Sequence, residues 1–200
     1  MERIGEFLPF MLEGSVTTVQ VFVLTLVLSL PLGLPIALGS NSRFKPLSFL
    51  CKIYVWIFRG TPLMLQLWFF YFFFPFNFGI VLDAMATAVL TYVLNYAAYF
   101  AEIYRGGINS IDRGQYEAAH ALGLSKKQTM FDIILPQTMK AILPPVVNEA
   151  ITLVKDTALV SALAVIDLMK ATNSAVNRTT SLTPFFYAAI IYLLMTFVLT

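Results

Sequence analysis

Five long apolar stretches fill most of this 200-residue chain, and each has about the length that a membrane-crossing helix requires. A helix needs about 20 predominantly apolar residues to cross the hydrocarbon core of a bilayer. Backbone groups in lipid must also find their hydrogen bonds within the protein, which favours helices. The predicted spans are 16–38, 53–74, 82–104, 145–169 and 184–200. The sequence therefore predicts an all-α membrane protein with five transmembrane helices, built as a single domain over 1–200.

Composition excludes an ordinary soluble domain. Hydrophobic residues make up 58% of the chain and charged residues 12%, whereas soluble domains average about 45–50% and about 25%. The single cysteine, Cys51, excludes a disulfide framework within the chain. Basic residues lie in short loops and form no continuous stripe, so no nucleic-acid partner is predicted.

The basic residues also predict an orientation, because cytoplasmic loops carry an excess of Lys and Arg. One side of the predicted membrane holds eight of them: Arg43, Lys45, Lys52, Arg105, Arg113, Lys126, Lys127 and Lys140. The other side holds Arg3, Lys170 and Arg178. The long loop at about 105–140 is therefore expected in the cytoplasm, with the N-terminus outside and the C-terminus inside. Since no basic residue follows the last span, we expect the natural protein to continue into a short basic tail.

This long loop contains signals for two short helices joined at a glycine. Asp112 is a good N-cap for the first helix, and Gly123 is expected to stop that helix in the left-handed conformation. Ser125 and Gln128 have the spacing of a capping box at the start of the second helix. Pro136 is expected to limit or kink the second helix. Such an element between membrane spans is suited to being held by a partner on one side of the membrane.

The loop also carries a specific spacing of residues, with Glu117-Ala118-Ala119 followed by Gly123, Ile133 and Leu135-Pro136. This pattern resembles the EAA motif in the membrane-spanning subunits of binding-protein-dependent ABC importers. Three further blocks resemble the polar amino acid permeases among them, which import histidine, arginine, glutamine, glutamate or cystine. These blocks are FRGTP at 58–62, AEIYRGGI at 101–108 and LVKDTALVS at 153–161. The alternative for the loop is an ordinary amphipathic helix pair at the membrane surface.

The resemblance implies the type I ABC importer permease fold in a bacterial cytoplasmic membrane. It implies that the EAA segment is a coupling helix seated in a groove of a cytoplasmic ATPase. The implied partners are ATPase subunits, an extracytoplasmic solute-binding protein, a second permease (identical or homologous), membrane lipid and an amino acid. The chain has no phosphate-cradling glycine loop, so it is not expected to be an enzyme. ATP and Mg²⁺ are expected on the partner ATPase, and no cofactor or metal in this chain.

Polar residues within the predicted spans are candidates for the solute path, because ionisable groups at membrane depth are costly and usually face a cavity or a partner. Five of them recur at helical spacing in the fourth span and one lies in the third. They are Asn148, Glu149, Thr152, Lys155, Asp156 and Asn95. Carboxylates there can receive an amino group or a cationic side chain, and Lys155 can meet a carboxylate. In relatives that bind basic amino acids, the acidic residue after Asn in this block resembles the cargo ligand, which corresponds to Glu149.

Other roles for these residues stay open. Lys155 and Asp156 could neutralise each other within the bundle or bind across a subunit interface, and Asn95 could form an interhelical hydrogen bond. The overall prediction is the permease subunit of an ATP-driven importer of polar amino acids, with cationic cargo modestly favoured by Glu149. The alternatives are a membrane enzyme, for which no catalytic constellation is visible, and an ion-coupled secondary transporter. The second class usually shows internal repeats, and none is visible here.

Overall fold

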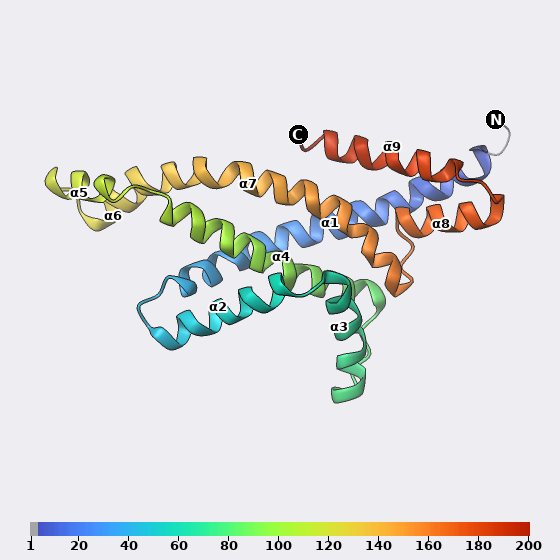
Figure 1. Cartoon of the computed structure of the whole chain (residues 1–200), viewed down its shortest axis with the longest axis horizontal. Coiled ribbons are helices and arrows are strands. Elements are labelled where there is room, and N and C mark those ends of the chain that lie inside the picture. Colours follow the sequence, from blue (N-terminus) through green and yellow to red (C-terminus); the bar gives the residue numbers. More distant parts are fainter. Residues whose placement is uncertain (1–3) are drawn as a thin grey trace. The chain divides into compact units, whose positions relative to one another are not determined.

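The structure is a computed structural model that describes residues 4–200, and no residue in this range lies in a strand. The predicted all-α class is therefore confirmed for this range. The elements in chain order are α1 (Ile4–Ser40), α2 (Lys45–Gly60), α3 (Leu63–Phe78), α4 (Ala84–Asn109), α5 (Arg113–Ala121), α6 (Lys126–Gln128), the π-helix η1 (Thr129–Ile134), α7 (Leu135–Asp156), the 3₁₀ helix η2 (Thr157–Leu163), α8 (Leu168–Thr179) and α9 (Thr183–Phe197) (Figure 1).

The chain divides into two compact units, each assembled from separate stretches of sequence. Unit 1 combines the stretch up to Leu28 with Thr61–Asn95 and Ala150–Thr200. Unit 2 combines Ser29–Gly60 with Tyr96–Glu149. The prediction of a single domain over 1–200 stays a prediction.

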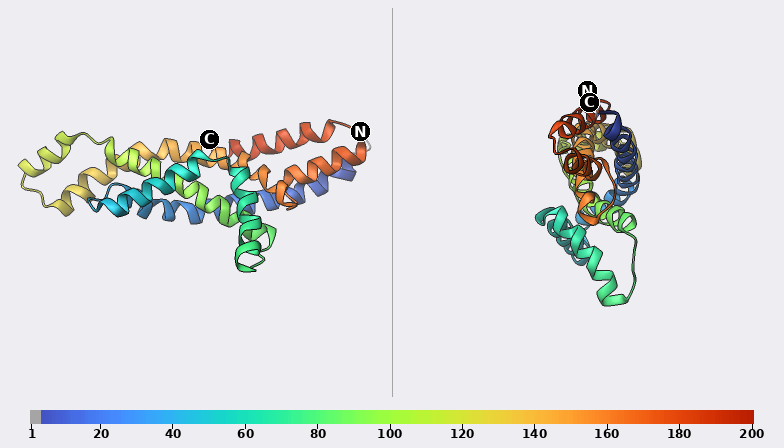
Figure 2. Two further views of the ribbon diagram at one scale, coloured as in Figure 1. Left: turned by 60° about the horizontal axis from the view of Figure 1, so that its bottom comes forward. Right: turned by 90° about the vertical axis from the view of Figure 1, so that its right-hand side faces the viewer.

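Unit 1 has a core where the first half of α1 meets α8 and α9, which run beside one another in Figures 1 and 2. Its buried members are all apolar, and three of them are alanines: Phe7, Met11, Leu168, Ala171, Ala175 and Ala188. Asp167 begins α8 by accepting hydrogen bonds from the backbone N–H groups of Met169 and Lys170. A Cβ on Gly14 would lie 2.6 Å from the Asp167 carbonyl oxygen, so only glycine allows α1 to approach this turn so closely.

Unit 2 contains a second close helix contact, between α1 and α4. A Cβ on Gly33 would lie 2.9 Å from Phe100 Cβ, 3.1 Å from Ala101 N and 3.2 Å from Ala97 O. Small residues allow such approach, and packing of this kind drives helix association in lipid. Tyr104 donates a hydrogen bond to the Leu30 carbonyl at 3.2 Å across the same contact.

A Gly33→Ala substitution is expected to lower the melting temperature of the detergent-solubilised protein, because backbone atoms of α4 occupy the space of the added methyl. Overpacking of this kind costs about 1–3 kcal/mol. The matched control is Gly106→Ala, also within a helix, where nothing lies within 4 Å of the new Cβ. Equal melting temperatures for the two variants would contradict the packing described for Gly33.

The predicted membrane spans are confirmed only in part. Within residues 4–200, Phe7–Ser40 and Ala84–Asn109 are long and apolar enough to cross a bilayer. α2 and α3 pass the same criteria only together, as a pair interrupted between Gly60 and Leu63. The predicted span at 53–74 is thus divided into two helices, since the Pro62 backbone is extended there (φ −61°, ψ 133°).

The expectation about the fourth span is corrected, and that about the fifth is not confirmed. The predicted fourth helix at 145–169 begins ten residues earlier, at Leu135, and its α-helical part ends at Asp156. Thr157 follows in the 3₁₀ helix, where its hydroxyl bonds to the Val154 carbonyl at 2.6 Å, a side-chain bond that competes with regular helix. The predicted fifth span at 184–200 corresponds to α9, which is apolar but, with 15 residues, shorter than a typical membrane-crossing helix. Arg3, which was counted for orientation, lies outside the described residues.

Candidate functional site

The α5 segment forms as the sequence predicts, because residues at both of its ends satisfy helix-terminal groups. At the start, the Asp112 carboxylate accepts a hydrogen bond from Gly114 N at 2.6 Å. At the end, Gly123 adopts φ 74°, and its N–H bonds to the His120 carbonyl while Leu124 N bonds to the Ala119 carbonyl, both at 3.0 Å. This bond pair is a Schellman motif, which a left-handed glycine makes at low cost.

The chain then reverses into a second short helix through the predicted capping box. Ser125 Oγ accepts from Gln128 N at 3.3 Å, and Gln128 Oε1 accepts from Ser125 N at 3.0 Å. The π-helix η1 follows and leads directly into α7. Pro136 therefore does not end the second helix, because helical backbone continues through it. It lies in the first turn of α7, where a missing N–H costs little.

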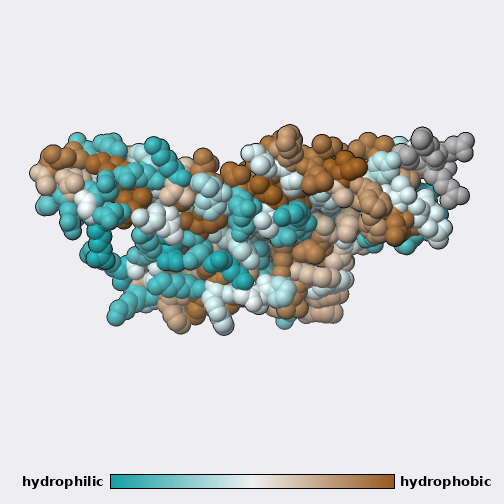
Figure 3. Space-filling model, turned by 45° about the horizontal axis from the view of Figure 1, so that its top comes forward, coloured by the Kyte–Doolittle hydropathy of each residue, from teal (hydrophilic) through white to brown (hydrophobic). Residues whose placement is uncertain are grey.

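Some residues of the motif are exposed to solvent and others are buried. Glu117 and Ala118 are exposed, whereas Ala119 and Ile134 are each 1% exposed and pack inside unit 2. Leu122 is 78% exposed immediately before the turn at Gly123. In Figure 3 the end of the chain that holds α5 and α6 is mostly hydrophilic, with separate hydrophobic patches. Met130 and Phe131 of η1 are exposed as well.

The remaining motif residues lie in the segment that returns to the membrane span. Ile133 is half-buried, while Gly123, Leu135 and Pro136 are exposed. The Gln137 side-chain amide connects this segment to α5, because it donates to Gln115 Oε1 at 3.2 Å and to the Ile133 carbonyl at 2.9 Å. The sequence interpretation overlooked Leu122, although an apolar side chain just before a helix-ending glycine is a readable signal.

Asn95 lies in a buried polar network of unit 1. It is 3% exposed, and its Nδ2 donates to Gln66 Oε1 of α3 at 2.9 Å. Gln66 Nε2 in turn donates to Thr61 Oγ1 at 2.8 Å and to the Thr61 carbonyl at 3.1 Å. The structure therefore places Asn95 in an interhelical hydrogen bond, and its role toward cargo stays a prediction. Gln66 was missed because a lone glutamine within an aromatic run gives no signal of its partner.

The polar residues of the fourth span all lie on α7 and on the side that is more accessible. In unit 1, Ala150, Leu153 and Val154 are buried, whereas Thr152 and Asp156 are half-buried and Lys155 is exposed. Earlier on the same helix, in unit 2, Glu149 is half-buried and Asn148 is exposed. All five residues therefore belong to one helix, and their role in solute binding stays a prediction.

A tyrosine of α4 marks the place where α7 loses its regular form. Tyr92 is fully buried, and its hydroxyl donates to the Asp156 carbonyl at 2.6 Å. Tyr92 lies three residues before Asn95, so this part of α4 packs against the end of α7 within unit 1.

The known proteins that this chain resembles are all membrane components of transport systems. The sequence profile of the family described as "Binding-protein-dependent transport system inner membrane component" matches residues 29–200. The arginine transport system permease protein ArtQ of Bacillus subtilis is 41% identical over 96% of this chain and 89% of the relative. The L-cystine transport system permease protein TcyB of the same organism is 35% identical, covering 97% and 83%. A putative glutamine transport system permease protein of Rickettsia prowazekii is 39% identical, covering 80% and 74%.

Solved structures support the same grouping. The crystal structure of an amino acid ABC transporter with histidines superposes with a TM-score of 0.91 at 34% identity, covering 98% of this chain and 92% of that one. An inward-facing structure of the MetNI methionine ABC transporter superposes with a TM-score of 0.72 at 18% identity, covering 96% and 90%. The second likeness concerns the fold alone.

Proposed function

Because this chain belongs to the family of binding-protein-dependent inner membrane transport components, we propose that it is the permease subunit of an ATP-driven importer of polar amino acids. The observation that carries this proposal is that the Glu-Ala-Ala part of the motif forms a helix with a solvent-exposed side, which ends in a Schellman turn at Gly123. Relatives are described as permeases for arginine, glutamine and cystine. ATP and Mg²⁺ bind to a separate ATPase in this proposal, and this chain is not itself an enzyme.

The exposed side of α5 is the surface that the ATPase holds. Ala118 is small and exposed, Glu117 offers a charge, and Leu122 offers an apolar contact. Movement of α5 reaches α7 through the Gln137–Gln115 bond and through the buried Ile134. Closure of the ATPase dimer on ATP would thus move the membrane helices that continue from this element.

The membrane arrangement follows from the same proposal. The chain crosses the bacterial cytoplasmic membrane five times, with its N-terminus outside and its C-terminus in the cytoplasm. One such bundle has too few helices to enclose an alternating-access path. A second permease, identical or homologous, therefore completes the path, and an extracytoplasmic binding protein delivers the solute.

Cargo is proposed to bind along the polar stripe of α7. Glu149 and Asp156 lie two helical turns apart and can receive the amino group or cationic side chain of an amino acid. Lys155 can bind the cargo carboxylate, while Asn148, Thr152 and Asn95 supply neutral hydrogen-bonding groups. Bound cargo shifts the importer between states only through its different affinity for each state.

Reconstitution into proteoliposomes tests the proposed class of transporter. With the ATPase and the binding protein present, uptake of a labelled polar amino acid is expected to require ATP and to persist when ionophores collapse the ion gradients. Uptake by the permease alone, driven by a proton or sodium gradient, would instead support the ion-coupled alternative.

A further inference from the structure

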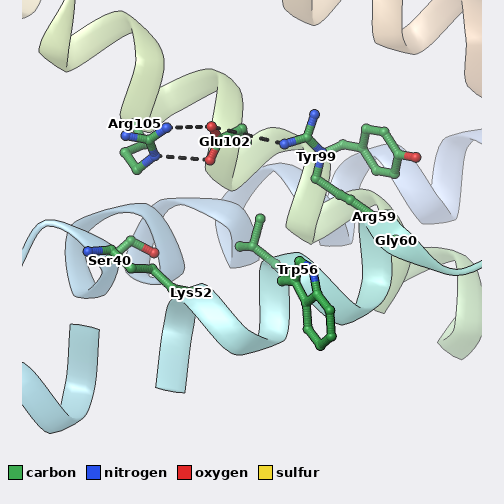
Figure 4. Close-up of a pocket in the computed structure, with 9 residues that line it drawn as sticks. Ser40, Lys52, Trp56, Arg59, Gly60, Tyr99, Glu102 and Arg105 are labelled. Atoms are coloured by element: carbon green, nitrogen blue, oxygen red, sulfur yellow. Dashed lines mark hydrogen bonds and ion pairs between the residues drawn. The ribbon is translucent and has the colours of Figure 1, made fainter. Parts of the chain in front are cut away.

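A charged cavity of about 570 Å³ lies within unit 2, and no residue of the EAA motif or of the stripe on α7 is among the described residues that line it. Its chemistry comes from six side chains drawn in Figure 4: Lys52, Trp56, Arg59, Tyr99, Glu102 and Arg105. Nothing in the proposed transport cycle uses these residues. They therefore require a separate explanation.

Helical spacing places these side chains on two facing helix surfaces. On α2, Lys52, Trp56 and Arg59 follow one another at four and three residues, which puts them on one side of the helix. On α4, Tyr99, Glu102 and Arg105 follow one another at three residues. The two surfaces meet at Arg59, whose guanidinium carbon lies 5.2 Å from the centre of the Tyr99 ring.

Among the described residues, Glu102 supplies the one carboxylate that lines the cavity, and this carboxylate is bound to arginine. Arg105 Nε donates to Glu102 Oε2 at 2.9 Å, and its terminal amino group donates to Glu102 Oε1. The guanidinium of Arg59 approaches the same Oε1 at 4.0 Å, so that Glu102 lies between two arginines (Figure 4). Three cations and one anion leave the cavity with a net charge of +2, which favours an anionic ligand.

This electrostatic pattern argues against an amino acid as the ligand. A zwitterionic amino acid has an ammonium group that needs a free carboxylate, and both oxygens of Glu102 accept hydrogen bonds from Arg105. A phosphate group has no such requirement, and arginine binds its oxygens well. The charge of Glu102 is thus already neutralised by Arg105, while Lys52 and Arg59 leave the cavity with a net positive charge for an anion.

The surroundings of the cavity favour a lipid as the source of the phosphate. Trp56 lines the cavity and is 75% exposed, and tryptophan is enriched at the headgroup level of membranes. Exposed apolar residues of α2, Phe49 and Leu50, continue along the same helix toward its start. Basic pockets between membrane helices on the cytoplasmic side bind anionic headgroups in other proteins.

We propose that the cavity between α2 and α4 in unit 2 binds the phosphate of an anionic phospholipid from the cytoplasmic leaflet. Arg59 and Lys52 contact the phosphate oxygens, Arg105 is held in place by Glu102, and Trp56 packs against the glycerol region. The lipid bridges α2 and α4, which are separate in sequence.

The test titrates phosphatidylglycerol into the purified importer, permease together with ATPase, and counts bound lipids by native mass spectrometry. The Lys52→Gln/Arg59→Gln variant is expected to bind phosphatidylglycerol about 30-fold more weakly, since each basic residue near a lipid surface contributes a factor of about five. A control with the same loss of charge outside the cavity, Lys127→Gln/Lys140→Gln, is expected to retain binding. Phosphatidylcholine is expected to bind all forms equally weakly.

A variant that is expected to raise the affinity for the lipid distinguishes loss of recognition from damage to the fold. Glu102→Gln removes the only carboxylate of the cavity and is expected to tighten phosphatidylglycerol binding, an outcome that misfolding cannot produce. Equal binding by the cavity variant and the control would overturn the proposal. Displacement of the lipid by an excess of inorganic phosphate would also overturn it, because the site would then belong to a soluble anion.

Discussion

A Gly123→Pro substitution is expected to abolish ATP-dependent uptake while the chain still inserts into the membrane. Gly123 adopts φ 74°, whereas proline is held near −65°. Proline also lacks the N–H that bonds to the His120 carbonyl at 3.0 Å. The turn after α5 cannot form, so Leu122 and Glu117 lose their positions for the ATPase. Uptake in proteoliposomes and co-purification of the ATPase measure the effect.

A milder pair of variants shows whether the position of the turn matters. Gly123→Ala meets no atom within 4 Å but carries the strain of a left-handed alanine, about 1–2 kcal/mol, so partial loss of uptake is expected. Gly79→Ala carries the same strain at another left-handed glycine, which ends α3, and also meets nothing within 4 Å. Normal uptake is expected for Gly79→Ala. Equal losses in the two variants would remove the special role of the coupling turn.

A Glu149→Gln substitution is expected to reduce uptake of a cationic amino acid by roughly 10- to 100-fold, the effect of losing a hydrogen bond to a charged group. Glutamine has almost the same shape, so assembly with the ATPase and the melting temperature are expected to remain near those of the parent protein. Uptake of a neutral polar amino acid is expected to change less. Competition between labelled and unlabelled amino acids measures both.

The control for Glu149 is Glu13→Gln, which removes an exposed carboxylate of α1 outside the polar stripe. Its uptake is expected to match that of the parent protein. If Glu149→Gln transports cationic cargo as well as Glu13→Gln does, Glu149 has no role in cargo binding and the stripe must be assigned another function.

Local signals in the sequence predict α5 and its surroundings well. The N-cap at Asp112, the stop at Gly123 and the capping box at Ser125 each depend on residues within a few positions of one another. Such contacts are visible in sequence because the partners are neighbours. Pro136 was misjudged because its effect depends on where α7 begins, which the preceding π-helix determines.

Local signals between neighbouring residues could not predict the interruption of the fourth span. α7 ends at Asp156, whose carbonyl accepts a hydrogen bond from Tyr92, 64 residues earlier in the chain. The pairing of Asn95 with Gln66 likewise joins residues 29 positions apart. Hydrophobic periodicity identifies a membrane segment but contains no information on such distant partners. The polar stripe itself was predictable, because helical spacing alone places its members on one side of α7.

The central claim is that α5 is a coupling helix that an ATPase binds on the cytoplasmic side. Labelling of a single cysteine tests this claim most directly. The protein carries Leu122→Cys in a Cys51→Ser background and is exposed to a membrane-impermeant maleimide. We expect labelling in inside-out vesicles, none in intact cells, and protection when the ATPase is bound. Labelling from outside intact cells, or equal labelling with and without the ATPase, would contradict the account.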